Sequence, residues 1–87
     1  MLNVFKSLVI NQLKQRINFM NQRMHGEELR IYESGTKYCL IILFDINNQV
    51  VLGSITLNAS ARRDLCMTKA FLSLIENTRI PKAVLAA

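Results

Sequence analysis

The chain has 87 residues, a net charge of +5 at pH 7, two cysteines and one histidine. This length predicts a single domain over residues 1–87, and so few Cys and His residues cannot build a typical four-ligand zinc site. Its three glycines form neither G-x-x-x-x-G-K nor G-x-G-x-x-G, the usual phosphate-binding patterns. We therefore expect no metal, no cofactor and no enzymatic activity.

A long amphipathic helix is predicted over residues 1–25. Apolar residues recur there at steps of three or four, which is the helical period. This stripe comprises Leu2, Phe5, Val9, Leu13, Ile17, Met20 and Met24. Leu8, Ile10 and Phe19 lie beside the stripe and widen it, which favours contacts on more than one side. Gly26 is suited to cap the end of this helix.

The same 25 residues carry most of the positive charge. They include no acidic residue and four basic ones, Lys6, Lys14, Arg16 and Arg23. Charges on both flanks of an apolar stripe are typical of a packed helix whose long side chains reach into solvent. A phosphate-binding strip is the alternative interpretation, and a membrane-surface helix is less favoured than either.

Three strands are predicted within residues 29–57, at 29–33, 37–45 and 49–57. Ser34-Gly35 and Asn47-Asn48 suit two-residue hairpin turns, because Gly and Asn tolerate positive φ. The sequence therefore predicts an antiparallel meander whose middle strand is the most apolar.

These turns also predict which side chains share a face of the sheet. They pair Ile31 with Tyr38 and Phe44 with Val51, and both hairpins then agree on one face. The predicted core face holds Leu29, Ile31, Tyr38, Leu40, Ile42, Phe44, Val51, Ile55 and Leu57. The opposite face would present a partner or dimer surface formed by Arg30, Tyr32, Ile41, Leu43, Val50 and Leu52. Since Tyr32 is the only aromatic residue there, stacking of RNA bases is disfavoured.

A second helix is predicted over residues 59–78, with Asn58 or Ser60 as its N-cap. Its expected buried stripe consists of Met67, Ala70, Phe71, Leu74 and Ile75. Pro81 prevents continuation of the helix, and residues 79–87 form a tail. The predicted fold class is α+β in the order α-β-β-β-α, with the three-stranded meander packed against both helices.

These features favour a small non-enzymatic module that binds and modulates another macromolecule. The chain is 51% hydrophobic, so we expect apolar surface to be shared in a homodimer and with an unidentified protein partner. The alternative is a nucleic-acid-binding protein that uses its basic helices. Its contacts would be Lys6, Lys14, Arg16, Arg23, Arg62, Arg63 and Lys69.

The remaining signals concern location and lifetime. The chain begins without a recognisable secretory signal, and Cys39 and Cys66 have no C-x-x-C partner, so a cytoplasmic protein with free thiols is expected. His25 is interpreted as a surface residue at a helix end. Small size and basic charge suit accessory proteins of phages and mobile elements. The ending Leu85-Ala86-Ala87 resembles the bacterial trans-translation tag, which implies a short-lived regulator or inhibitor.

Overall fold

The computed structural model describes residues 2–81, with side chains from residue 7 onward. Its elements follow the predicted order α-β-β-β-α: α1 (Leu2–Asn21), β1 (Glu27–Ser34), β2 (Tyr38–Asp45), β3 (Val50–Asn58) and α2 (Arg62–Arg79). The three strands form one antiparallel sheet in the order β1-β2-β3. The α+β prediction is confirmed.

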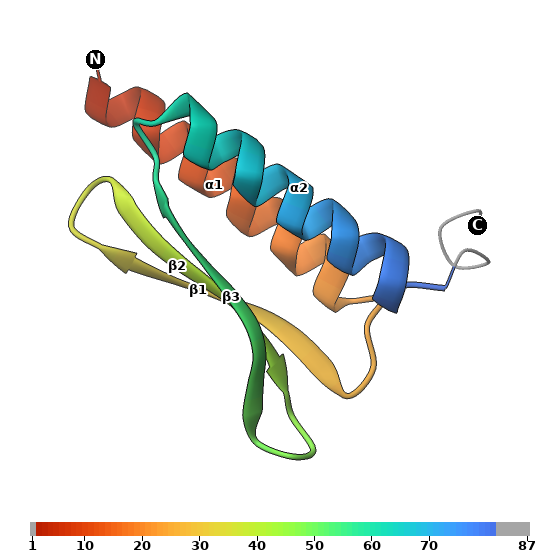
Figure 1. Cartoon of the computed structure of the whole chain (residues 1–87). Coiled ribbons are helices and arrows are strands. Elements are labelled where there is room, and N and C mark those ends of the chain that lie inside the picture. The colour runs from red at the N-terminus through yellow and green to blue at the C-terminus, as the bar shows by residue number, and fades with distance from the viewer. Residues whose placement is uncertain (1, 82–87) are drawn as a thin grey trace.

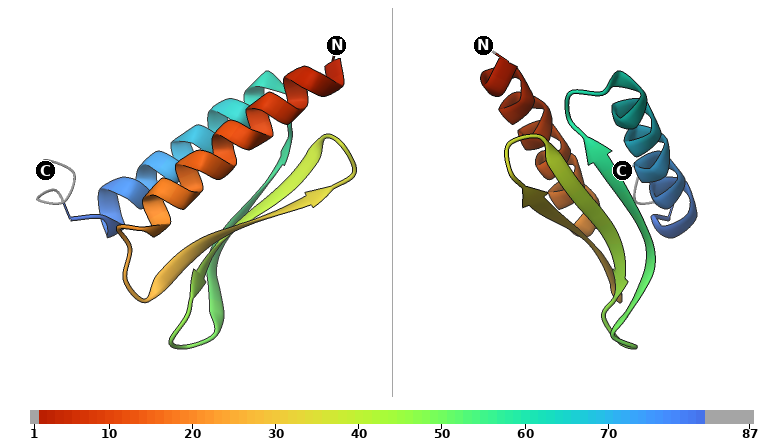
Figure 2. Two further views of the ribbon diagram at one scale, coloured as in Figure 1. Left: turned by 180° about the vertical axis from the view of Figure 1, so that it is seen from behind. Right: turned by 60° about the vertical axis from the view of Figure 1, so that its left-hand side comes forward.

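The two helices form one layer and the sheet forms the other. Figure 1 and Figure 2 show α1 and α2 side by side and parallel, so both begin at the same end of the molecule. Helix α1 lies mainly against β1, and α2 lies mainly against β3. Among residues 2–81, no helix covers the opposite face of the sheet (Figure 2), and neither helix is long and apolar enough to cross a membrane.

Helix α1 ends four residues before its predicted end, because Asn21 turns back onto β1. The Asn21 side-chain amide donates a hydrogen bond to the Leu29 carbonyl (3.0 Å), and its oxygen accepts one from the Leu29 amide (2.8 Å). Gly26 lies in the connection rather than at the helix end, with φ at +78°. Its carbonyl accepts a hydrogen bond from Ile46, and a Cβ there would lie 3.0 Å from Asn47 Nδ2. The positive φ therefore favours glycine here, and the nearby Asn47 side chain leaves little room for a Cβ unless it moves.

The predicted stripe of α1 faces the core as far as the structure describes it. Its buried members are Leu13, Ile17, Met20 and Met24, while Leu2 and Phe5 lie outside the described side chains. Ile10 is also buried, whereas Leu8 and Phe19 are exposed. The extra apolar residues of this helix therefore divide between core and surface.

The predicted register of β1 and β2 is wrong. Residues 35–37 form a three-residue turn, so Ser34 faces Tyr38 and Ile31 faces Ile41 instead of Tyr38. This is a shift of three residues. Because side chains alternate along a strand, an odd shift transfers all of β2 to the other face. Cys39, Ile41 and Leu43 therefore point into the core.

The predicted pairing of β2 with β3 is right near the turn and shifts by one residue beyond it. Phe44 faces Val51 as predicted, but Leu43 faces Gly53, which leaves Leu52 as the extra residue of a β-bulge. The predicted core positions are right in β1 and in β3 beyond the bulge, but Val51, predicted to face the core, is exposed. Leu29 and Leu57 are buried, and Ile31 and Ile55 pack against the core.

The turn between β2 and β3 is centred on Asn47 and Asn48, as predicted. One Asp45 carboxylate oxygen accepts hydrogen bonds from the amides of Asn47 (3.0 Å) and Asn48 (3.1 Å), and the other accepts one from the Asn48 side chain (2.8 Å). These bonds, with those of Asn48 first, lower the pKa of Asp45. The turn is thus held by one charged side chain that is itself half-buried.

Helix α2 differs from prediction in its start and in its buried side. Ala61 is the N-cap residue and makes no side-chain cap bond, while the Asn58 amide donates to the Asp64 carboxylate (2.9 Å). The buried residues are Thr68, Leu72 and Ile75, whereas Met67 (52%) and Leu74 (61%) are exposed. Thr68 can face the core because its hydroxyl donates to the Asp64 carbonyl one turn earlier (2.8 Å).

Candidate interaction surfaces

The structure separates the six residues predicted as one partner surface. Ile41 and Leu43 lie in the core, with 0% and 4% of their surfaces exposed, so their assignment to a partner surface was wrong. The shifted register of β2 is the cause. Tyr32 and Arg30 do lie on the open sheet face, and Val50 and Leu52 are exposed at the start of β3.

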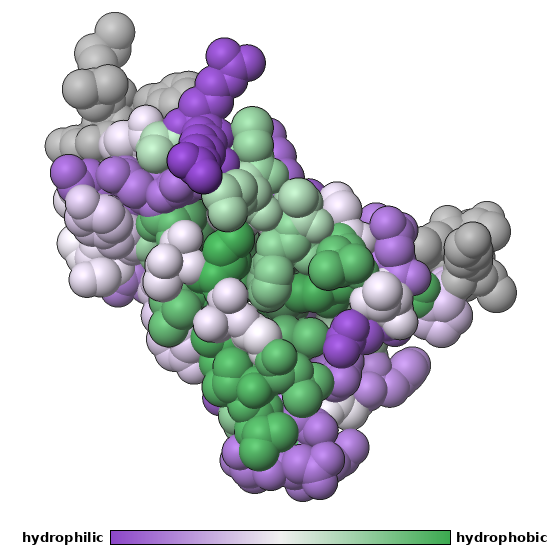
Figure 3. Space-filling model, in the orientation of Figure 1, coloured by the Kyte–Doolittle hydropathy of each residue, from purple (hydrophilic) through white to green (hydrophobic). Residues whose placement is uncertain are grey.

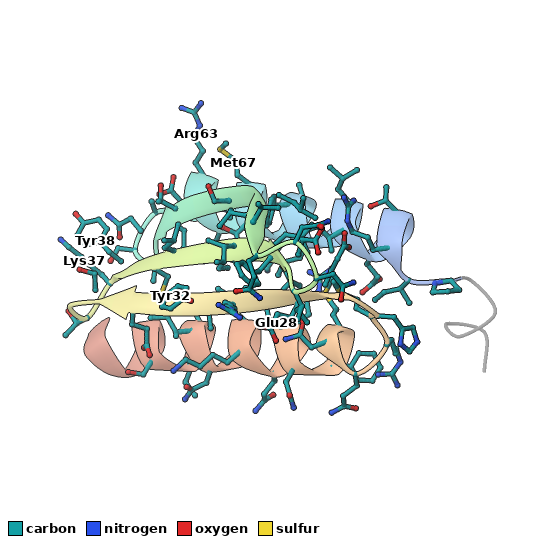
Figure 4. All side chains as sticks on the ribbon, turned by 90° about the horizontal axis from the view of Figure 1, so that it is seen from below. Glu28, Tyr32, Lys37, Tyr38, Arg63 and Met67 are labelled. Carbon is teal, nitrogen blue, oxygen red and sulfur yellow. The ribbon has the colours of Figure 1, made fainter. Side chains whose placement is uncertain are left out.

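The shift of β2 places aromatic residues on the open sheet face that the sequence had assigned to the core. Tyr38 joins Tyr32 there, and both side chains are about half exposed (Figure 4). A cavity of about 450 Å³ opens beside them. Further along the face, the Arg30 guanidinium lies 4.0 Å from the centre of the Phe44 ring and pairs with Glu28 at 2.6 Å. The hydrogen bond to Glu28 raises the pKa of Arg30.

A second surface lies where the outer side of α2 meets β3. Its exposed members, which we call the α2–β3 surface, are Val50, Leu52, Met67, Ala70 and Leu74. Figure 3 shows apolar areas over the middle of α2 and over the start of β3 on the same side of the molecule. The two elements meet at Gly53, where a Cβ would lie 3.8 Å from the Phe71 ring.

The two edge strands differ in charge. Strand β1 has the sequence EELRIYES, with four charged residues, whereas β3 has the sequence VVLGSITLN, with none. Natural edge strands use charged side chains to prevent pairing with other chains. In residues 2–81 no strand pairs with the outer edge of β3. Beyond the bulge at Leu52, residues 53–58 of this edge are regular and uncharged.

Two of the predicted nucleic-acid contacts are engaged within the protein. Lys14 forms an ion pair with Glu33 at 2.6 Å. Arg23 lies 3.5 Å from the centre of the Phe19 ring and donates a hydrogen bond to the Phe19 carbonyl (2.8 Å). The side chain of Lys6 lies outside the described residues.

Two other predicted contacts, Arg16 and Lys69, line the groove between the helices. This groove of about 390 Å³ is lined by Leu8, Val9, Gln12, Leu13, Arg16, Leu65 and Lys69. Arg16 crosses it to donate a hydrogen bond to the Ser73 hydroxyl (3.0 Å). Arg62 lies seven residues before Lys69, which places both on the same side of α2. Arg63 instead points outward near Met67 (Figure 4).

The residues with catalytic potential do not form a cluster. Within the described part of the chain, no three Cys, His, Asp or Glu side chains come together as metal ligands would. His25 is exposed beside the α1–β1 connection. Cys39 is buried and Cys66 is exposed. Burial first, and the charge of Glu33 second, raise the pKa of Cys39.

The difference in burial between Cys39 and Cys66 predicts that the two thiols react at different rates. We expect an aromatic disulfide reagent at pH 8 to modify Cys66 quickly, because that side chain is exposed on α2. Cys39 should react only when the sheet opens, since a buried thiol with a raised pKa is both shielded and protonated. Stopped-flow absorbance should therefore show one fast equivalent in the native protein and two in denaturant. Two fast equivalents in the native protein would contradict the core position of Cys39.

The ending Leu85-Ala86-Ala87, considered above as a degradation signal, lies outside the described residues. No family model, curated protein or solved structure matches the chain. A function for the chain is therefore inferred from the surfaces of its own structure.

Proposed function

We propose that the protein is a small non-enzymatic interaction module that acts as a homodimer and regulates a macromolecule that it binds. One observation supports the dimer above all others. The uncharged outer edge of β3 lies beside exposed apolar side chains of α2. A second copy of this chain is the occupant that we assign to the α2–β3 surface.

A two-fold axis beside β3 would use both parts of this surface at once. Antiparallel pairing of β3 with β3 of the second copy extends the sheet to six strands and gives hydrogen-bond partners to the backbone of the edge. The same axis brings the two α2 helices together, because α2 lies over β3 (Figure 1). Such a contact is self-complementary, as two-fold interfaces must be.

The distribution of charge supports a self-contact here rather than at the other edge. On the outer side of α2, Met67, Ala70 and Leu74 are uncharged, and Arg63 lies one turn before them. Two antiparallel copies can therefore meet at the middle of α2 without like charges facing each other there. Strand β1, with three glutamates, would bring carboxylates together in the same arrangement. The second copy therefore fits β3 and is disfavoured at β1.

Light scattering coupled to size-exclusion chromatography tests the dimer. At about 100 µM protein we expect a mass near twice the 10.0 kDa of one chain. Leu74→Lys should shift the mass toward one chain, because a charge would be buried in the contact. Leu40→Lys on the open sheet face is the matched control and should leave the dimer intact.

Two outcomes would contradict this proposal. One is a single-chain mass for the unchanged protein at this concentration. The other is a dimer that survives Leu74→Lys but is lost in Leu40→Lys, which would move the contact to the open sheet face. Circular dichroism of each variant confirms that the fold itself is retained.

A further inference from the structure

The acidic side chains of the protein are largely occupied away from the groove between the helices. Glu27 pairs with Arg79 (3.0 Å), and the other two glutamates of β1 pair with Arg30 and Lys14. The carboxylates of Asp45 and Asp64 accept backbone amide hydrogens. Two acidic residues, Asp64 and Glu76, lie on α2 itself, and Glu76 follows Lys69 by seven residues on the same side of the helix. The excess of positive charge is therefore confined to the first half of α2 and the facing part of α1.

Arg16, Arg62 and Lys69 remain without an ion pair among the side chains of residues 7–81. Arg62 and Lys69 share one side of α2, and Lys69 lines the same groove as Arg16. The three cations thus form a strip over the helix layer, on the side of the molecule away from the open sheet face. We call it the basic strip.

Part of this positive charge does not stabilise the fold. Arg62 and Arg63 occupy the first turn of α2, where the helix dipole disfavours cations. Lys37 lies at the same end, since its carbonyl accepts a hydrogen bond from Ala59 just before α2 (2.6 Å). Asp64 in the same turn offsets one of the two arginines. The positive charge that remains at this end, together with Lys37, suits an anionic ligand.

We propose that the basic strip binds the phosphate backbone of double-stranded nucleic acid. A duplex presents closely spaced phosphates along its length, and lysine and arginine side chains contact them irrespective of sequence. Single strands are usually held by stacking of bases on aromatic side chains. The exposed tyrosines, Tyr32 and Tyr38, lie on the open sheet face, and Arg63 points away from them (Figure 4). Among the described side chains, the exposed aromatic nearest to the strip is Phe19, and Arg23 already lies over its ring at 3.5 Å. The strip therefore fits a backbone better than it fits stacked bases.

Fluorescence anisotropy with labelled 20-base-pair DNA and RNA duplexes, and with the corresponding single strands, tests this inference. Three phosphate contacts predict a slope of about −2.7 for log K against log salt on DNA, or about a 40-fold loss of affinity between 50 and 200 mM salt. Replacing both Arg62 and Lys69 by Gln should bring that slope near −0.9. Arg79→Gln is the control, because Arg79 pairs with Glu27 at the far end of α2, and its slope should be unchanged.

The result also distinguishes the kind of duplex. Equal binding of DNA and RNA supports contact with phosphates alone, and tighter binding of RNA supports the same strip with added contacts to 2′-hydroxyls. Absence of binding to either duplex at about 50 mM salt and 50 µM protein would overturn the proposal. So would an equal loss in Arg79→Gln, or a preference for single strands that is removed by Tyr32→Ala with Tyr38→Ala. None of these outcomes depends on the dimer, because the Leu74→Lys variant retains the strip.

Discussion

Replacing Leu43 with lysine should unfold the protein, whereas the same change at Leu40 should leave it folded. Leu43 is 4% exposed and belongs to the core, while Leu40 lies on the open sheet face. Loss of a buried leucine side chain alone costs about 2–5 kcal/mol. Burial of an unpaired ammonium adds to this cost, and the total approaches the 5–15 kcal/mol that stabilises a typical domain.

Circular dichroism and thermal melts of the two variants measure this difference. A cooperative melt for Leu40→Lys and none for Leu43→Lys are the expected results. The reverse pattern would mean that β2 presents its other face to the helices, as the two-residue turn at Ser34-Gly35 would have required. The pair of variants therefore tests the register directly, because the same substitution is placed once on each face of β2.

Asn21→Leu should lower the free energy of unfolding by about 2–3 kcal/mol. The substitution keeps the size of the side chain but removes both hydrogen bonds to Leu29, a residue that is 3% exposed. The Leu29 amide and carbonyl would then lack partners in a mostly buried place, and each such loss costs about 1–3 kcal/mol.

Urea denaturation provides the measurement. Asn18→Leu is the matched control, since Asn18 is exposed on the same helix and a surface change of this kind costs within about 0.5 kcal/mol. Equal midpoints for the two variants would show that the Asn21 bonds contribute nothing to the joining of α1 and β1.

The order and type of the elements followed from hydrophobic periodicity, but the facing of β2 did not. In β1 and β3 the polar residues alternate, so the pattern identified Ile31 and Ile55 as core-facing. The segment CLIILF of β2 is apolar on both faces, and its side could be assigned only through the turn. The turn has three residues rather than two and lies further along the chain. The two faces of β2 are therefore exchanged relative to the prediction.

For the candidate sites too, the sequence predicted the residue types but not how the fold brings them together. Sequence alone identified Arg16, Arg62 and Lys69 as candidate nucleic-acid contacts, but that Arg16 and Lys69 line one groove depends on how α1 and α2 lie together. The outer apolar side of α2 was missed because Thr68 takes a core position through its bond to the Asp64 carbonyl. A threonine whose hydroxyl donates a hydrogen bond to its own helix can be buried like a small apolar residue. A hydropathy pattern treats threonine as polar and so places it on the surface.

Each helix covers the strand that is its neighbour along the chain, α1 on β1 and α2 on β3, and the strands pair in sequence order. The loops that folding must close are therefore short, and their entropic cost is small. Folds with such local contacts reach the native state quickly. During synthesis, α1 can therefore pack on β1 as soon as that strand is made, and its contacts with α2, such as Arg16 with Ser73, wait for the last element.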